Sequence, residues 1–111
     1  MTLRTPEVII HRSESLNQEQ YDLFLLTKPP LSSRSELCLK LACLSGSAII
    51  YLAGDGVYHL LTGIEEQPEF RICACKEDLE ARAISAGEKV IVPDDFYATL
   101  IEDIMECCSH A

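Results

Sequence analysis

The sequence is poor in positive charge, and this shortage limits the partners that the protein can bind. Its 111 residues include 9 lysines and arginines against 18 aspartates and glutamates, a formal net charge of −9 at pH 7. The basic residues are scattered along the chain rather than gathered in one segment. Because nucleic-acid binding depends on clustered lysine and arginine, we expect no direct contact with nucleic acid.

Long apolar runs are missing as well. No segment contains the roughly 18 consecutive apolar residues of a membrane-spanning helix, so we expect no membrane association. Residues 1–20 lack the apolar run of a secretory signal peptide, which favours a cytoplasmic location. Since cytosolic thiols are normally kept reduced, we expect the 6 cysteines to be free.

Common motifs for metal and cofactor binding are also absent. The cysteines and histidines show neither paired CxxC nor HxxxH spacing, so we expect no bound metal. Cys107, Cys108 and His110 are close in the sequence, but a structural zinc site needs four ligands. Gly54-Asp55-Gly56 is not followed by the Lys-Ser or Lys-Thr of a P-loop, and we expect no cofactor.

The chain does contain enough apolar material for a folded core. Hydrophobic residues make up 48% of it, and a chain of this length forms one domain. Residues 1–20 are mostly polar and are predicted to be an N-terminal extension. Its apolar patch, Val8-Ile9-Ile10, is expected to pin it to the domain or to a partner. Residues 21–111 are predicted to form the domain itself.

Apolar runs alternate with helical patterns along this domain. The apolar runs predict four strands, at residues 21–27, 48–53, 70–75 and 89–92. The helical patterns predict helices at residues 33–44, 57–61, 77–84 and 96–108. Continuous apolar strands joined by helical crossovers favour a parallel sheet covered on both faces. We therefore predict a single three-layer α/β domain with a four- or five-stranded, mainly parallel sheet.

Right-handed crossovers favour the strand order 2-1-3-4. That order would leave a crevice between the carboxyl ends of the first and third strands. Thr27-Lys28 and Cys73–Lys76 lie at those ends, so the crevice is expected to contain two cysteines.

Short polar residues and glycines mark the ends of the helices. Ser32-Ser33, Asp55 and either Asp94 or Asp95 are suited to capping the first, second and last helix, and Gly46 is suited to ending the first.

Apolar stripes mark the faces of the helices. In the first helix, Leu37, Leu41 and Leu44 share a face, and Cys38 and Cys43 are expected to pack. This helix has little polar surface, which predicts an oligomer. In the last helix, a single stripe is formed by Tyr97, Leu100, Ile101, Ile104, Met105 and Cys108. The solvated face is predicted to carry Glu102, Asp103 and Glu106.

The strongest candidate site is Cys73-Ala74-Cys75, which ends a strand just before a helix. Helix amides and Lys76 are expected to favour a thiolate at Cys75, whereas Glu77 and Asp78 oppose it. Cys73 shares a strand face with Cys75 and is either a second redox thiol or a core residue. Burial as a small apolar residue is the alternative for Cys75. The predicted catalytic residues are thus Cys75, Cys73 and Lys76.

His59 is either an acid–base group or a histidine with satisfied hydrogen bonds.

Three short segments, in their order and spacing, carry a resemblance to a known family. They are Gly54-Asp55-Gly56-Val57, Glu77-Asp78-Leu79-Glu80-Ala81-Arg82 and Asp95-Phe96. With them, residues 21–106 resemble the DsrE/DsrF/DsrH superfamily and, within it, the DsrH (TusB) branch. The resemblance implies a subunit of a cytosolic sulfur-relay complex, which passes persulfide sulfur toward tRNA 2-thiouridine or through dissimilatory sulfur metabolism.

The resemblance also implies partners and a site. The partners would be DsrE (TusD)-like and DsrF (TusC)-like subunits, or further copies of the chain, together with a sulfur-carrier protein. In DsrE-like subunits the sulfur-carrying cysteine ends the third strand, and Cys75 occupies that place here, with Ala83 in the place of the family's glycine. Subunits of the TusB type often lack that cysteine. Two alternatives therefore stay open, which are a non-catalytic assembly subunit and a regulatory domain that binds a small ligand.

Overall fold

The computed structural model describes residues 8–10 and 21–109, and it describes side chains for residues 21–106. The strands are β1 (Val8–Ile10), β2 (Asp22–Leu26), β3 (Ala48–Leu52), β4 (Phe70–Ala74) and β5 (Val90–Ile91). The α-helices are α1 (Ser33–Ser45), α2 (Lys76–Ala81) and α3 (Phe96–Ser109), and the 3-10 helices are η1 (Gly54–Thr62) and η2 (Ile64–Glu66). In this part of the chain, no helix combines the length and apolar character that a membrane span requires.

The five strands form one sheet in the order β1-β2-β3-β4-β5. The pairs from β2 to β5 are parallel, and β1 is antiparallel to β2, with Val8 opposite Leu25. The predicted fold class is therefore confirmed. The apolar patch at residues 8–10 was expected to contact either the domain or a partner, and it pairs with β2 of the domain.

The predicted strand order 2-1-3-4 is wrong, because the four parallel strands lie in sequence order. Each crossover moves the chain in the same direction across the sheet, so β3 lies between β2 and β4. The crevice expected between the ends of the first and third strands does not form. Thr27-Lys28 and Cys73–Lys76 are consequently separated by the end of β3.

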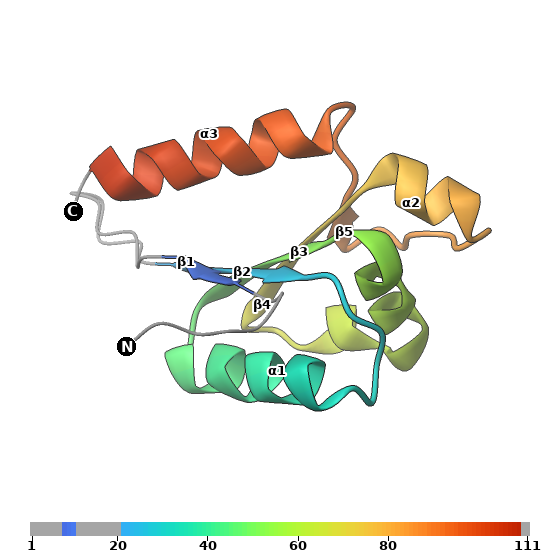
Figure 1. Ribbon diagram of the computed structural model, residues 1–111, viewed down its shortest axis with the longest axis horizontal. Helices are drawn as coiled ribbons and strands as arrows, with labels where there is room; N and C mark the ends of the chain where they lie inside the picture. The colour runs from blue at the N-terminus through green and yellow to red at the C-terminus, as the bar shows by residue number, and fades with distance from the viewer. Residues whose placement is uncertain (1–7, 11–20, 110–111) are drawn as a thin grey trace.

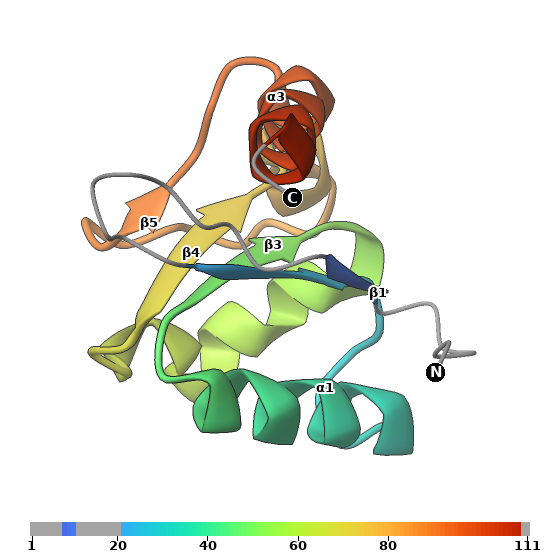
Figure 2. The ribbon, with the colours of Figure 1, turned by 90° about the vertical axis from the view of Figure 1, so that its left-hand side faces the viewer.

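The helices cover both faces of the sheet, but unequally (Figures 1 and 2). α1, η1 and η2 lie on one face, and α3 lies on the other. Right-handed crossovers that advance in one direction place their helices on the same face, which explains this division. The core beneath α1 and η1 includes Phe24, Ile50 and Ile72, whereas the core beneath α3 includes Tyr51 and Phe96.

Helix α1 begins and ends as the sequence predicts. The Ser32 hydroxyl accepts a hydrogen bond from the Ser35 amide at 3.0 Å, and Gly46 ends the helix with a φ of 80°. Its buried face differs from the prediction, since the helix buries Ser35, Cys38 and Ala42. Leu37 and Leu44 face outward, and Cys43 is exposed instead of packed. Leu39 and Leu41 are partly buried against the same core.

Helix α3 is capped by Asp95, whose carboxylate accepts a hydrogen bond from the Ala98 amide at 3.0 Å. The predicted single apolar stripe is wrong, because its members divide between two surfaces. Leu100 and Ile104 pack on the sheet. The solvent-facing side carries Tyr97, Ile101 and Met105. Asp103 is also not on the solvated face, since it accepts a hydrogen bond from the Tyr51 hydroxyl beneath the helix.

Candidate functional site

Cys75 lies at the junction between β4 and α2. It is the N-cap residue of α2, one position beyond the end of the strand. Its amide donates to the Leu52 carbonyl at 3.0 Å, which fixes the junction against the end of β3. The residue is only 3% exposed, so the partly exposed thiol that the sequence predicts is not found.

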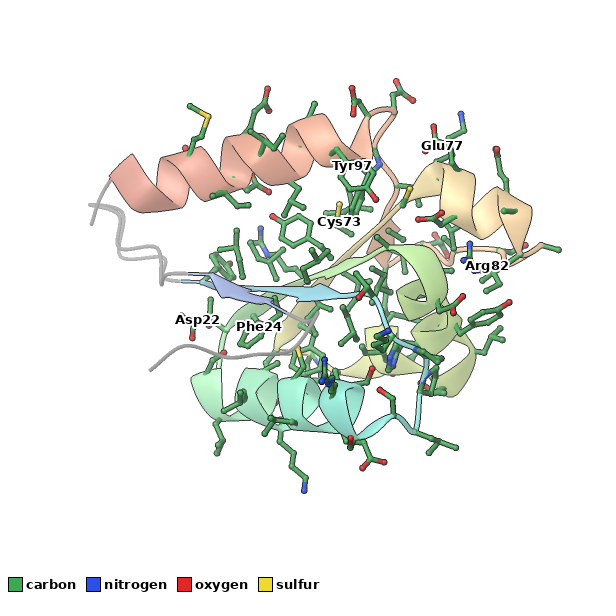
Figure 3. The ribbon with its side chains drawn as sticks, in the orientation of Figure 1. Asp22, Phe24, Cys73, Glu77, Arg82 and Tyr97 are labelled. Carbon is green, nitrogen blue, oxygen red and sulfur yellow. The ribbon has the colours of Figure 1, made fainter. Side chains whose placement is uncertain are left out.

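A pocket of about 400 Å³ opens beside Cys75, where the end of β4 meets the start of α3. Figure 3 shows Glu77 and Tyr97 on the two helices that meet here. The lining residues are Cys75, Glu77, Asp78, Asp94, Asp95, Phe96 and Tyr97. Four of these seven residues are aspartates or glutamates, so their carboxylates make the pocket repel anions. The thiol and the aromatic rings supply its less polar surface.

The surroundings of Cys75 favour the neutral thiol. Burial raises its pKa, and the carboxylates of Asp78 and Glu77 add to the rise, whereas the Asp78 backbone amide lowers it. The thiol donates a hydrogen bond to the Glu77 carboxylate at 3.5 Å. Lys76 is exposed and is not among the causes of this shift. The amide and the two acids act in the predicted directions, and Lys76 does not contribute. The net result is a raised pKa for Cys75, because burial and two acids outweigh one amide.

Cys73 in β4 and Cys75 just beyond it both belong to the core beneath α3, so they share a face of the sheet as predicted. Its pKa is raised to about 11 by burial, by the negative charge of Asp103, and by repulsion from Cys75 once that thiol is ionised. Asp103 comes from α3 and accepts the hydrogen bond of Tyr51, the residue paired with Cys73 across the sheet. Of the two alternatives for Cys73, the structure therefore fits a buried core residue better than a second redox thiol. Sequence analysis missed Tyr51 and Asp103, which are 52 positions apart.

Arg82 connects the first two segments that carry the family resemblance. Its Nε and Nη2 atoms donate to Asp55 at 3.2 and 3.1 Å, and Nη1 donates to the Asp78 carbonyl at 3.2 Å. Asp78 in turn accepts a hydrogen bond from the Gly54 amide at 2.6 Å. Asp55 was expected to cap η1, but Ala53 is the N-cap residue, and Asp55 pairs with Arg82 instead.

Two backbone positions, one in the first segment and one just after the second, are tightly constrained. A Cβ atom on Gly56 would lie 1.8 Å from the Leu26 carbonyl oxygen, so only glycine fits between η1 and the end of β2. Ala83, just after the C-cap of α2, has a φ of 55°, a left-handed conformation that favours glycine.

His59, the remaining candidate among the described side chains, does not line this pocket. His59 is buried, and its Nε2 atom donates to the Lys28 carbonyl at 2.9 Å, as expected for a histidine with satisfied hydrogen bonds. Within the described residues, no cluster of three or more histidine, cysteine or acidic side chains is arranged to hold a metal ion. The predictions for Cys107, Cys108 and His110 fall on side chains outside the described residues.

Comparison with known proteins gives no relative: no family model, curated protein or solved structure matches the chain.

Proposed function

We propose that this chain is a subunit of a cytoplasmic sulfur-relay complex of the DsrE/DsrF/DsrH kind. One observation supports this most, namely that the three segments of the resemblance meet at one edge of the sheet. Arg82 pairs with Asp55, which links the second segment to the first. Asp78 of the second segment and Asp95-Phe96 of the third line the same pocket. Three short segments from separate parts of the sequence thus lie together in the fold.

Within such a complex, an assembly role fits the geometry best. A sulfur carrier needs an accessible thiolate, and Cys75 is buried, with a raised pKa, beside two acids. Exposed apolar side chains on α1 and α3 provide surface for neighbouring subunits. The partners proposed for these surfaces are the DsrE-like and DsrF-like subunits.

A second candidate is sulfur transport on Cys75 itself, and the pocket that reaches this residue favours it. The Cys75 thiolate would attack the outer sulfur of a donor persulfide. A new sulfur–sulfur bond would form at Cys75, the donor's bond would break, and the donor would leave as a thiolate that takes up a proton. The exchange is redox-neutral, because one persulfide replaces another.

Persulfide loading distinguishes these two roles. The chain, carrying Cys107→Ser and Cys108→Ser, is incubated with a small-molecule persulfide donor, and each cysteine peptide is analysed by mass spectrometry. We expect exposed Cys43 to gain sulfur and to be alkylated first, and we expect Cys75 to react far more slowly. Adding Cys43→Ser should then remove nearly all of the sulfur gain.

Fast, selective loading of Cys75 that survives Cys43→Ser and disappears in Cys75→Ser would contradict the assembly role. It would establish the carrier role instead.

A further inference from the structure

The outward face of α3 carries an apolar stripe that the described part of the chain leaves more than half exposed. Tyr97, Ile101 and Met105 are spaced four residues apart and are 55%, 54% and 65% exposed. Side chains at this spacing lie on one side of a helix, and the stripe is about 12 Å long at 1.5 Å per residue. Tyr97 also lines the pocket beside Cys75, so the stripe continues the wall of that pocket.

One long edge of this stripe is acidic. Glu102 and Glu106 are exposed and follow Ile101 and Met105 by one position, which places them on the adjoining row of the helix. Exposed Asp94 and Asp95 lie just before the helix begins. The sequence Phe96–Ser109 contains no lysine, arginine or histidine to balance these charges.

The charge distribution determines which occupant fits the stripe. A second copy of the chain would bring its own carboxylates toward these, and like charges in contact oppose association. A segment with an apolar face bordered by lysine or arginine would bury the stripe and neutralise its acidic edge.

We infer that the stripe Tyr97–Ile101–Met105 docks a basic amphipathic helix of a different protein. The docked helix would also cover the mouth of the Cys75 pocket, because Tyr97 belongs to both surfaces. This inference does not rest on sulfur chemistry, and it would hold for a chain whose Cys75 never carries sulfur.

A pair of synthetic peptides tests the proposal on the full chain. One is a fluorescent helical peptide of leucine and lysine with a single apolar face, and the other has glutamate in place of lysine. We expect fluorescence anisotropy to show binding of the lysine peptide alone. Ile101→Glu should weaken that binding by about tenfold or more, although it makes the protein more negative.

Leu44→Glu is the matched control, because it adds the same charge at an exposed leucine on α1. It should change the affinity by less than about twofold, since long-range attraction between exposed charges is screened by salt. Both variants should melt like wild type, as substitutions at exposed positions usually do.

Three results would overturn the proposal. Equal or tighter binding by Ile101→Glu would show that charge alone attracts the peptide. Equal binding of the glutamate peptide would exclude a basic partner. A dimer in light scattering that Ile101→Glu dissociates and Leu44→Glu does not would assign the stripe to a second copy. The assay measures no sulfur, so its failure leaves the relay proposal to its own test.

Discussion

At the scale of single residues, two cysteine thiols have raised pKa values and one alanine has a left-handed backbone conformation. Burial and two neighbouring acids raise the pKa of Cys75, and burial and Asp103 raise the pKa of Cys73 to about 11. Ala83 adopts a left-handed φ of 55° at the position where the resemblance implies glycine. The backbone at residue 83 therefore has a conformation that favours glycine over the alanine present there.

Ala83→Gly should stabilise the protein. A left-handed φ costs a residue with a Cβ atom about 1–2 kcal/mol, and the greater entropy of an unfolded glycine returns part of this. The expected gain in the free energy of unfolding is about 0.5–1 kcal/mol, measured by urea denaturation. Ala81→Gly, at the exposed last residue of α2, is the control and should destabilise. Equal losses in both variants would contradict a strain at residue 83.

Alkaline pH should destabilise the protein through Cys73. Its pKa rises from 9.0 in its ordinary state to about 11 in the folded protein, so the unfolded chain loses this proton first. The contribution of the Cys73 thiol to the free energy of unfolding is therefore fully present below about pH 9, and it is lost as the pH rises toward 11. Between about pH 8 and about pH 10.5 the loss should be about 2 kcal/mol. Cys73→Ala should change the free energy of unfolding at every pH, and it should also remove this part of the pH dependence. Parallel curves for the two proteins would show that Cys73 titrates normally.

At the scale of elements, the close approach of η1 to β2 supports the carboxyl edge of the sheet. Gly56 lies against the Leu26 carbonyl, and the Ala53 amide donates to the same carbonyl oxygen at 3.2 Å. Two residues before Gly56, the Gly54 amide binds Asp78 at the start of α2. The first two segments of the resemblance are thus joined through backbone as well as side-chain contacts.

Gly56→Ala should be strongly destabilising, because the new methyl group would overlap a backbone oxygen that cannot turn away. Forcing atoms into a filled space costs about 1–3 kcal/mol, and a backbone clash belongs at or above the upper end. Chemical denaturation of Gly56→Ala beside Gly87→Ala measures the effect. A Cβ on Gly87 would contact nothing within 4 Å, so that variant should be close to neutral. Similar stability of the two variants would argue against the tight contact.

Local signals predicted the elements better than their arrangement. Ser32, Gly46 and Asp95 act through neighbours three residues away or closer, so their roles could be inferred from sequence. The roles of Asp55 and Asp103 depend on partners 27 and 52 positions away, which no local pattern reveals. The thiol of Cys75 was misjudged for the same reason, because its exposure depends on the packing of α3. Strand order was missed because either order satisfies the same handedness rule.

At the scale of the whole molecule, the fold has one thick helical layer and one thin one. Among the described residues, α1 and the 3-10 helices cover one face of the sheet, and α3 is the one helix over the other face, whose core contains Cys73 and Cys75. That single helix buries the thiols on its inner side and presents apolar and acidic residues on its outer side. The surface nearest the pocket is therefore suited to contact with another protein.

Membership in a sulfur-relay complex is tested most directly by native mass spectrometry after co-expression with a DsrE-like and a DsrF-like subunit. We predict that the chain is recovered in equal proportion with both partners in one complex. The two partners assembled with each other, with this chain left out as a free species, would contradict the account.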